Sequence, residues 1–330
     1  MKNNSMNFPI KTTSLVCASL LATSATPVLA ENKSSLIGSI RIGALFEDVD
    51  GADATAEIEN FGSRLRWNGE RTITDSLNGI AYAEFRLESD ANNTNGSGIN
   101  RTRFLWAGVD GDFGKLQWGA QYGAYYNFIS SKADIAWWGS CFVGLECSRE
   151  TNVLKYTGNF GGFSIAASVE ATEDSDTVEN EVVDEFEFSI GYNFGNFGIN
   201  VGTAIFADET SIDDTGAEIS TDGGTLVGLS LTGDFGLGSI ALIFAGADED
   251  FSGSADDQTQ FSAAVTISDF YGVLETRDNG NGNDLLSATL GYTLNIAPSS
   301  LMYFEIQTLD DDVAGVDATT IGRATYKFDF

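Results

Sequence analysis

The chain has 330 residues, of which 17 are Lys or Arg, 48 are Asp or Glu and none is His, so its formal net charge at pH 7 is −31. A chain this acidic repels phosphate, which argues against nucleic acid as a partner. The absence of histidine excludes histidine-dependent hydrolases, most zinc sites and haem ligation by histidine. We expect no metal site, no cofactor and no enzymatic activity.

Residues 1–30 have the pattern of a signal peptide that is removed on export. Lys2 and Lys11 supply the positive start, and the apolar core from Ser14 to Ala25 is too short to span a bilayer. The small residues of Val28-Leu29-Ala30 precede a predicted cleavage site before Glu31. Residues 31–330 are predicted to form a single exported domain.

Three cysteines are present, and two of them lie close together in the exported part. Cys17 would suit a lipoprotein, but Val16 stands where a small residue is expected and the apolar core continues past it. Cys141 and Cys147 are too few for a disulfide scaffold or a four-cysteine metal site. In an oxidising compartment they form either one disulfide or two free thiols.

From Ser35 onward apolar and polar residues alternate, which indicates β-strands with one apolar and one polar face. In the first run Ile40 and Ile42 share a face opposite Arg41. About sixteen such runs of roughly nine to eleven residues are present, enough for strands that cross a membrane at a tilt. The pattern predicts an all-β fold, a 16-stranded antiparallel transmembrane β-barrel whose apolar face meets lipid and whose polar face lines a wet interior.

The same alternation predicts the details of the strands. In the run from Asn100 to Asp110, Arg103 is predicted to point inward, with Phe104 and Trp106 outward. Tight turns are predicted on one rim, at Leu77-Asn78-Gly79, Gly111-Asp112, Gly158-Asn159, Gly195-Asn196, Phe235-Gly236 and Ala297-Pro298. Long acidic connections are predicted on the other rim, at 90–98, 172–184, 208–222, 248–257, 278–284 and 310–317.

One segment, from Tyr122 to about Thr157, breaks the alternation for some twenty-five residues. It is too aromatic and too apolar to be a disordered linker. We expect it to fold into the barrel lumen as a constriction loop. Its acidic residues Asp134, Glu146 and Glu150 are the candidates for the loop side of the constriction.

Several stretches resemble the trimeric general diffusion porins of Gram-negative outer membranes. The first runs from Ser63 to Glu70 and continues to Glu84, the second is Asn100-Arg101-Thr102-Arg103, and the third is Phe113-Gly114-Lys115-Leu116. The chain ends in Tyr326, Phe328 and Phe330, similar to the alternating aromatic signal by which such barrels are recognised for insertion. The resemblance spans the whole exported part, and each piece alone is weakly specific.

The resemblance implies an outer-membrane location and a homotrimer. It also implies contact with outer-membrane lipid and lipopolysaccharide, and insertion by the barrel-assembly machinery. One departure is that the family's inward loop often carries a Pro-Glu-Phe-Gly-Gly type motif, whereas this chain has Ala136-Trp137-Trp138-Gly139-Ser140 there. Constriction geometry is therefore not transferred residue by residue.

Basic residues crowd into the first half of the chain, and most share the inward face. The predicted pore-lining cluster is Arg41, Arg64, Arg66, Arg86, Arg101, Arg103 and Arg149. By resemblance, Arg64 and Arg103 match the family's basic wall. The alternative is that these arginines pair with Glu84 and Glu88 and only hold the wall together, and both roles are compatible.

The predicted activity is passive diffusion of ions and small hydrophilic solutes, with cation preference because the chain is so acidic. One alternative is a sugar-selective porin in which Trp137 and Trp138 stack on the solute; the same indoles could instead anchor the loop. Another is a non-conducting adhesin or structural barrel plugged by its own loop.

Overall fold

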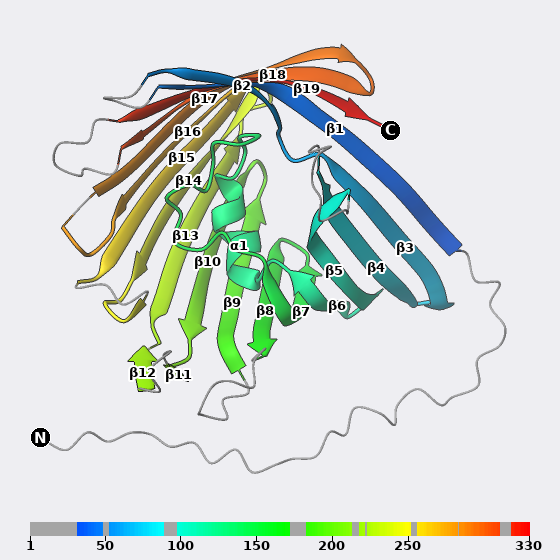
Figure 1. Cartoon of the computed structure of the whole chain (residues 1–330). Coiled ribbons are helices and arrows are strands. Elements are labelled where there is room, and N and C mark those ends of the chain that lie inside the picture. Colours follow the sequence, from blue (N-terminus) through cyan, green and yellow to red (C-terminus); the bar gives the residue numbers. More distant parts are fainter. Residues whose placement is uncertain are drawn as a thin grey trace, which may run out of the picture.

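A computed structural model of the chain describes residues 32–48, 53–88, 98–171, 183–212, 218–221, 223–251, 256–282, 284–310 and 318–330. The predicted signal peptide lies outside these residues, as do nearly all of the predicted connections 90–98, 172–184 and 310–317 and smaller parts of the other three. The described strands form a closed, 16-stranded antiparallel barrel, which confirms the predicted fold class (Figure 1). No helix among the described residues is long and apolar enough to cross a membrane.

The barrel strands succeed one another around the wall in chain order. The first half of the wall consists of β1 (Asn32–Asp48), β2 (Thr55–Asn60), β3 (Arg64–Thr74), β4 (Leu77–Leu87), β5 (Ile99–Gly111), β6 (Gly114–Gln121), β7 (Glu150–Phe160), β8 (Phe163–Ala171) and β9 (Val183–Phe194). The second half consists of β10 (Phe197–Phe206), β13 (Thr225–Asp234), β14 (Gly238–Ala247), β15 (Gln258–Ile267), β16 (Phe270–Asp278), β17 (Asp284–Ala297), β18 (Ser300–Asp310) and β19 (Thr319–Asp329). A separate hairpin is formed by β11 (Glu209–Ile212) and β12 (Glu218–Thr221).

Strands β2 and β3 together occupy one strand position in the barrel wall, with a bend between them. Both pair with β1, β2 through Ile42↔Asn60 and β3 through Ser39↔Arg64. At the bend Gly62 takes φ +77°, a conformation that favours glycine. Phe61 is thereby buried, with its ring edge-on to Trp138 at a centroid distance of 5.7 Å.

The barrel closes by pairing its first strand with its last. β1 and β19 run antiparallel over ten residue pairs, from Ser39↔Asp329 to Asp48↔Thr320. The pair Arg41↔Lys327 lies on this seam. Closure therefore brings a C-terminal cation to the arginines of the N-terminal strands.

The predicted alternation is confirmed along most strands, with apolar residues outward. On β9, for example, Phe188 is 41% exposed whereas Glu187 is 3% exposed. The prediction for Phe104 and Trp106 is wrong: Leu105 is the outward residue, and both aromatic side chains face the lumen. A β-bulge opposite Glu84 and Phe85 inserts Arg103 as an extra residue and shifts the parity of the strand.

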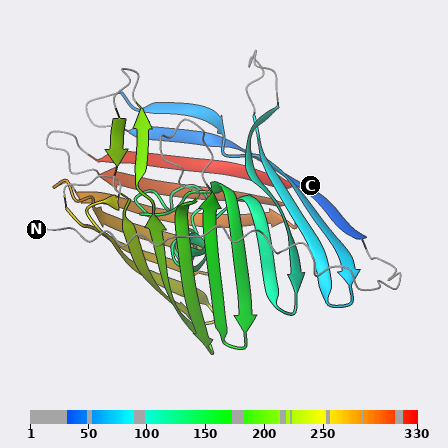
Figure 2. The ribbon, with the colours of Figure 1, turned by 90° about the horizontal axis from the view of Figure 1, so that it is seen from below.

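The tight turns gather at one rim, as predicted, but two of them lie elsewhere in sequence (Figure 2). The β3–β4 turn is at Asp75 and Ser76, just before the predicted site. Strand β7 continues through Gly158 and turns at Gly161, which has φ +66°. A Cβ at Gly158 would lie 2.6 Å from the Tyr156 hydroxyl and 2.7 Å from the Phe160 ring, so these side chains would have to shift.

The segment between β6 and β7 folds into the barrel, as Figure 1 shows. It contains the short helix α1 (Ala124–Phe128) and the 3₁₀ helix η1 (Ser130–Lys132). Tyr125 and Ile129 are fully buried against β10 and β13, where glycines make room for them. A Cβ at Gly228 would lie 2.3 Å from the Tyr125 hydroxyl oxygen, so the wall and the helix are fitted to each other.

Candidate functional site

A lumenal chamber of about 600 Å³ lies between the inward loop and the wall formed by β1, β3, β4, β5 and β19. Its basic lining is Arg41, Arg64, Arg66, Arg103 and Lys327, and its acids are Glu84 and Asp134. Its aromatic lining includes Tyr82, Phe104, Tyr122, Tyr126 and Trp137. Formal charges in the lining sum to five positive and two negative, so the chamber is locally positive within a very acidic chain.

Glu84 organises the basic wall of the chamber. Its carboxylate lies 2.5 Å from Arg66 Nε, 2.6 Å from Arg103 Nε and 3.4 Å from Arg64 Nη1. The Tyr82 hydroxyl donates a further hydrogen bond at 2.9 Å. Because the Glu84 side chain is only 2% exposed, it needs these partners to remain ionised inside the wall.

The remaining predicted arginines lie at different places. Arg41 is buried, donates to Ser39 Oγ at 3.1 Å and lies 5.3 Å from the Trp137 ring. Arg86 approaches the ring of Trp138. Arg101 is exposed, opposite Arg86 in the β4–β5 ladder, and does not line the chamber.

Arg149 closes the far end of the inward loop. Its guanidinium donates to the Tyr122 hydroxyl and stacks 5.5 Å from the Phe104 ring. Tyr122 in turn stacks on Tyr126 with ring centroids 3.6 Å apart. These inward aromatic contacts depend on the bulge at Arg103, which sequence alternation alone does not reveal.

Of the three predicted loop acids, only Asp134 faces the basic wall. It accepts hydrogen bonds from the Tyr126 hydroxyl and, at 2.8 Å, from Ser140 Oγ. Burial raises the pKa of the Tyr126 hydroxyl, and the Asp134 carboxylate adds to this shift. Tyr126 therefore remains a neutral donor that holds Asp134 in place.

Glu146 lies on the other side of the loop, away from the chamber, and the prediction of Glu150 as a loop acid is wrong because Glu150 is the first residue of the wall strand β7. Burial raises the pKa of Glu146 to about 7, and the carboxylates of Glu150 and Glu187 repel its charge further. The backbone N–H of Ser148 donates a hydrogen bond to the Glu146 carboxylate at 2.7 Å, which lowers the pKa of Glu146 and partly offsets the effect of burial. Glu146 is thus part of an acidic contact between loop and wall and not part of the arginine-facing constriction.

Two wall carboxylates hold the loop backbone. Glu275 accepts from the N–H groups of Cys141 and Phe142, both at 3.0 Å. Glu305 accepts from Trp137 N–H at 2.7 Å and Trp138 N–H at 3.3 Å. Sequence analysis missed both glutamates, because they lie more than 130 residues after the loop residues that they contact and only the closed barrel brings them together.

The loop is also linked to itself and to the wall through other side chains. Cys141 and Cys147 form a disulfide, with Cα atoms 6.1 Å apart. The Leu145 N–H donates to Gln260 Oε1 at 2.8 Å, and Thr289 donates to the Gly139 carbonyl at 2.6 Å. The loop is therefore fixed along its whole length.

The three C-terminal aromatic residues point outward. Tyr326, Phe328 and Phe330 are 43%, 42% and 60% exposed. The Phe330 ring lies over Gly38, whose N–H donates to the Phe330 carbonyl at 2.8 Å. They form an accessible apolar stripe along the end of the closing strand.

A closed sixteen-stranded barrel with an apolar outer surface, a polar lumen and an inward loop is the architecture of an outer-membrane β-barrel protein. Residues 16–314 match the family model described as Gram-negative porin. The chain therefore belongs to the Gram-negative porin family and is located in the outer membrane.

Individual relatives and structures agree with this assignment. The chain is 29% identical over 180 residues to outer membrane porin protein OmpD of Citrobacter koseri, covering 51% of this chain and 49% of the relative. It is 31% identical over 185 residues to putative outer membrane porin protein NmpC of Escherichia coli, covering 51% and 48%. The chain thus spans about half the length of the curated relatives it matches.

Solved structures share the fold at low sequence identity. An anion-selective porin from Comamonas acidovorans has a TM-score of 0.71 at 16% identity, covering 91% of this chain and all of that one. Salmonella typhi OmpF in complex with daunomycin has a TM-score of 0.69 at 16% identity, covering 91% and 98%.

Proposed function

We propose that the chain forms a water-filled pore through which ions and small hydrophilic solutes diffuse passively across the outer membrane. The observation that carries this proposal is the chamber between the basic wall and Asp134 on the fixed loop. Such a site filters solutes by size and by the field across it, without a chemical step. Purified protein in planar bilayers is expected to give stable conductance steps, and the absence of any conductance would favour a plugged or purely adhesive barrel.

Net cation preference is the second part of the proposal. The chain carries 48 acidic and 17 basic residues, so its pore mouths concentrate cations at low salt. Exposed charges are screened beyond about 8 Å at physiological ionic strength, so the preference should decline as salt rises. The reversal potential in a KCl gradient, measured at low and at high salt, tests both statements.

A second candidate, anion preference, is favoured by the excess of positive charge in the chamber lining. Two unit charges about 10 Å apart interact by roughly 0.4 kcal/mol in water and about 1.7 kcal/mol at a dielectric of 20, so the chamber alone could bias passage by a factor of about two to about seventeen. A reversal potential that shows cation preference would mean that the charges at the pore mouths control ion selectivity. One that shows anion preference would mean that the chamber controls it.

A sugar-selective path along Trp137 and Trp138 is disfavoured by their contacts. The Trp137 ring stacks on Tyr303 with a centroid distance of 5.0 Å, and Arg41 and Lys327 lie close to it. Trp138 packs against Phe61 and lies near two arginines. Both indoles thus act as anchors of the loop, and we expect oligosaccharides to cause no specific channel block.

We also propose that the protein is a homotrimer inserted by the barrel-assembly machinery and surrounded by lipopolysaccharide. A trimer form of Vibrio cholerae OmpT has the same fold, with a TM-score of 0.63. The outward stripe of Tyr326, Phe328 and Phe330 is suited to recognition during insertion. Native mass spectrometry tests the trimer, and deletion of Phe330 is expected to lower the yield of inserted barrel.

An assay of the pure protein for ester and peptide hydrolysis tests the absence of enzymatic activity.

A further inference from the structure

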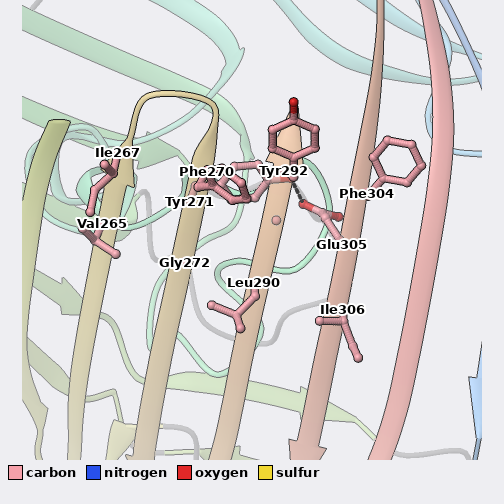
Figure 3. A pocket seen from close by; sticks show the side chains of 11 residues that line it. Val265, Ile267, Phe270, Tyr271, Gly272, Leu290, Tyr292, Phe304, Glu305 and Ile306 are labelled. Carbon is pink, nitrogen blue, oxygen red and sulfur yellow. Dashed lines mark hydrogen bonds between the residues drawn. The ribbon is translucent and has the colours of Figure 1, made fainter. Parts of the chain in front are cut away.

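An apolar dent on the outer surface of the barrel extends across β15, β16, β17 and β18 (Figure 3). A row of outward-facing residues that are direct cross-strand partners crosses the dent, and one residue of this row is a glycine. The row is Val265, Gly272, Leu290 and Ile306. Leu290 and Ile306 are 68% and 53% exposed, so none of the described residues covers the apolar walls of the dent.

The next row toward the tight-turn rim is bulky and forms the end of the dent. It consists of Ile267, Phe270, Tyr292 and Phe304, again direct cross-strand partners. Phe270 and Tyr292 pack with ring centroids 4.7 Å apart. Figure 3 shows the Tyr292 hydroxyl on the side of the β15–β16 turn. Tyr292 is thus placed like an aromatic residue at a membrane interface, with its ring in the hydrocarbon region and its hydroxyl toward water.

The dent exists because Gly272 leaves the row incomplete. Its volume is about 510 Å³, within the range of about 300–1,000 Å³ that is typical of sites for small molecules. Behind it, Tyr271 donates a hydrogen bond to Glu305 at 2.8 Å, so the lumenal side of this wall is filled and tied to the loop. The opening therefore faces only the surroundings of the barrel, which in an outer-membrane protein are hydrocarbon.

We propose that this dent holds one acyl chain of a glycerophospholipid from the periplasmic leaflet. The short turns of outer-membrane barrels face the periplasm, and the dent starts at that rim. Its lining is apolar except for Tyr292, at the end near the turns, and for Tyr271 and Glu305, whose polar groups are hydrogen-bonded to each other. Such a lining matches a hydrocarbon chain whose headgroup lies at the interface. An acyl chain in the dent would cover the exposed surface of leucine, isoleucine and phenylalanine side chains. Without it, these side chains are in poorly packed contact with mobile lipid.

The test is replacement of the missing side chain by Gly272→Leu in the full-length protein. Gly272 does not have positive φ, and its nearest neighbour for a new Cβ is the flexible Leu290 tip at 3.2 Å, so the variant can be accommodated. The protein is extracted in a mild detergent, and retained phosphatidylethanolamine is counted by native mass spectrometry. We expect the lipid-bound fraction to fall at least fivefold. Reloading the delipidated protein with phosphatidylethanolamine is expected to restore the bound state only in the parent chain.

Ala167→Leu is the matched control, because it adds a leucine to the outer face of β8 between Tyr156 and Phe188. It is expected to keep the bound lipid. Leu290→Ser, which removes one wall of the dent, is a second variant should Gly272→Leu fail to fold, and is expected to lose the lipid as well. Equal lipid retention in all variants would overturn the proposal. So would retention of lipopolysaccharide in place of phospholipid, or a change of oligomeric state that shows the dent to be filled by a second copy.

Discussion

Glu305 accepts the backbone N–H of Trp137 at 2.7 Å, so a carboxylate on β18 holds a loop that lies 168 residues earlier in the chain. The same oxygen also accepts from Trp138 N–H and from the Tyr271 hydroxyl. A buried donor left without an acceptor costs about 1–3 kcal/mol, so Glu305 is central to the fixed position of the loop.

Glu305→Ala is expected to loosen the loop while leaving the barrel closed. Three donors lose their acceptor, and the segment around Trp137 gains freedom to move in the pore. We expect larger open-channel current noise in single-channel recordings, with unchanged far-ultraviolet circular dichroism. Glu305→Gln, which keeps one acceptor oxygen, is expected to behave much closer to the parent. Quiet recordings from the alanine variant would show that the other clamps suffice.

Glu84→Gln is expected to shift ion selectivity toward anions. It removes the carboxylate shared by Arg64, Arg66 and Arg103 and leaves their charges uncompensated. A change of about 0.4 kcal/mol or more corresponds to at least about a twofold fall in the K⁺ to Cl⁻ permeability ratio. Glu70→Gln is the control, because Glu70 lies on β3 in an exposed pair with Lys33. Equal reversal potentials for the two variants would contradict a role for the chamber.

The disulfide between Cys141 and Cys147 is expected to survive in protein purified from the outer membrane. Peptide mapping without reductant should recover the two cysteines in one linked fragment. Closing so short a loop is worth about 2 kcal/mol in the chain-entropy model, so the Cys141→Ser and Cys147→Ser double variant should unfold more easily. Two alkylatable thiols in the untreated protein would instead favour the free-thiol alternative.

Stability is expected to fall as pH rises from about 4.5 to about 7 because of Glu146. Burial raises its folded-state pKa to about 7, above its ordinary value, so its contribution is complete at low pH and is lost as pH rises through 7. The loss from this residue is at most about 3 kcal/mol. Unfolding in denaturant as a function of pH should therefore be flatter for Glu146→Gln than for the parent, and parallel curves would refute the assignment.

Gly228→Val is expected to displace helix α1 from the wall. Its Cβ would lie 2.3 Å from the Tyr125 hydroxyl oxygen and 2.8 Å from Ile129 Cγ2. We expect destabilisation by about 1–3 kcal/mol together with altered conductance, because an overpacked contact must shift. Gly246→Val on the neighbouring strand meets nothing closer than 3.6 Å and should change neither property.

Alternation sufficed to predict the barrel because one face of every strand is outside and the other inside. On β9 the pattern of Phe188 against Glu187 is visible in the sequence itself. Alternation failed at Arg103, where one inserted residue changes the parity of the rest of β5. It also misplaced the β7 turn, because β7 continues to Phe160 and the chain reverses at Gly161, three residues after Gly158.

The chamber was less predictable than the barrel because it depends on contacts between distant strands. The crowding of arginines before the loop indicated the basic wall, but Lys327 joins it only through the β1–β19 pairing. Glu146 was expected to face the arginines, yet the course of the loop places it against the opposite wall. A charge count along the chain contains no information about which side of a folded segment a carboxylate occupies.

The pairing of β1 with β19 has a consequence for biosynthesis. The barrel is closed only when β19 pairs with β1. A chain without β19 would have two unpaired strand edges, whose peptide groups would have no hydrogen-bond partners in the hydrocarbon core of the bilayer. The strands must therefore remain in water until β19 has been translated and exported, and their entry into the bilayer becomes a single committed event.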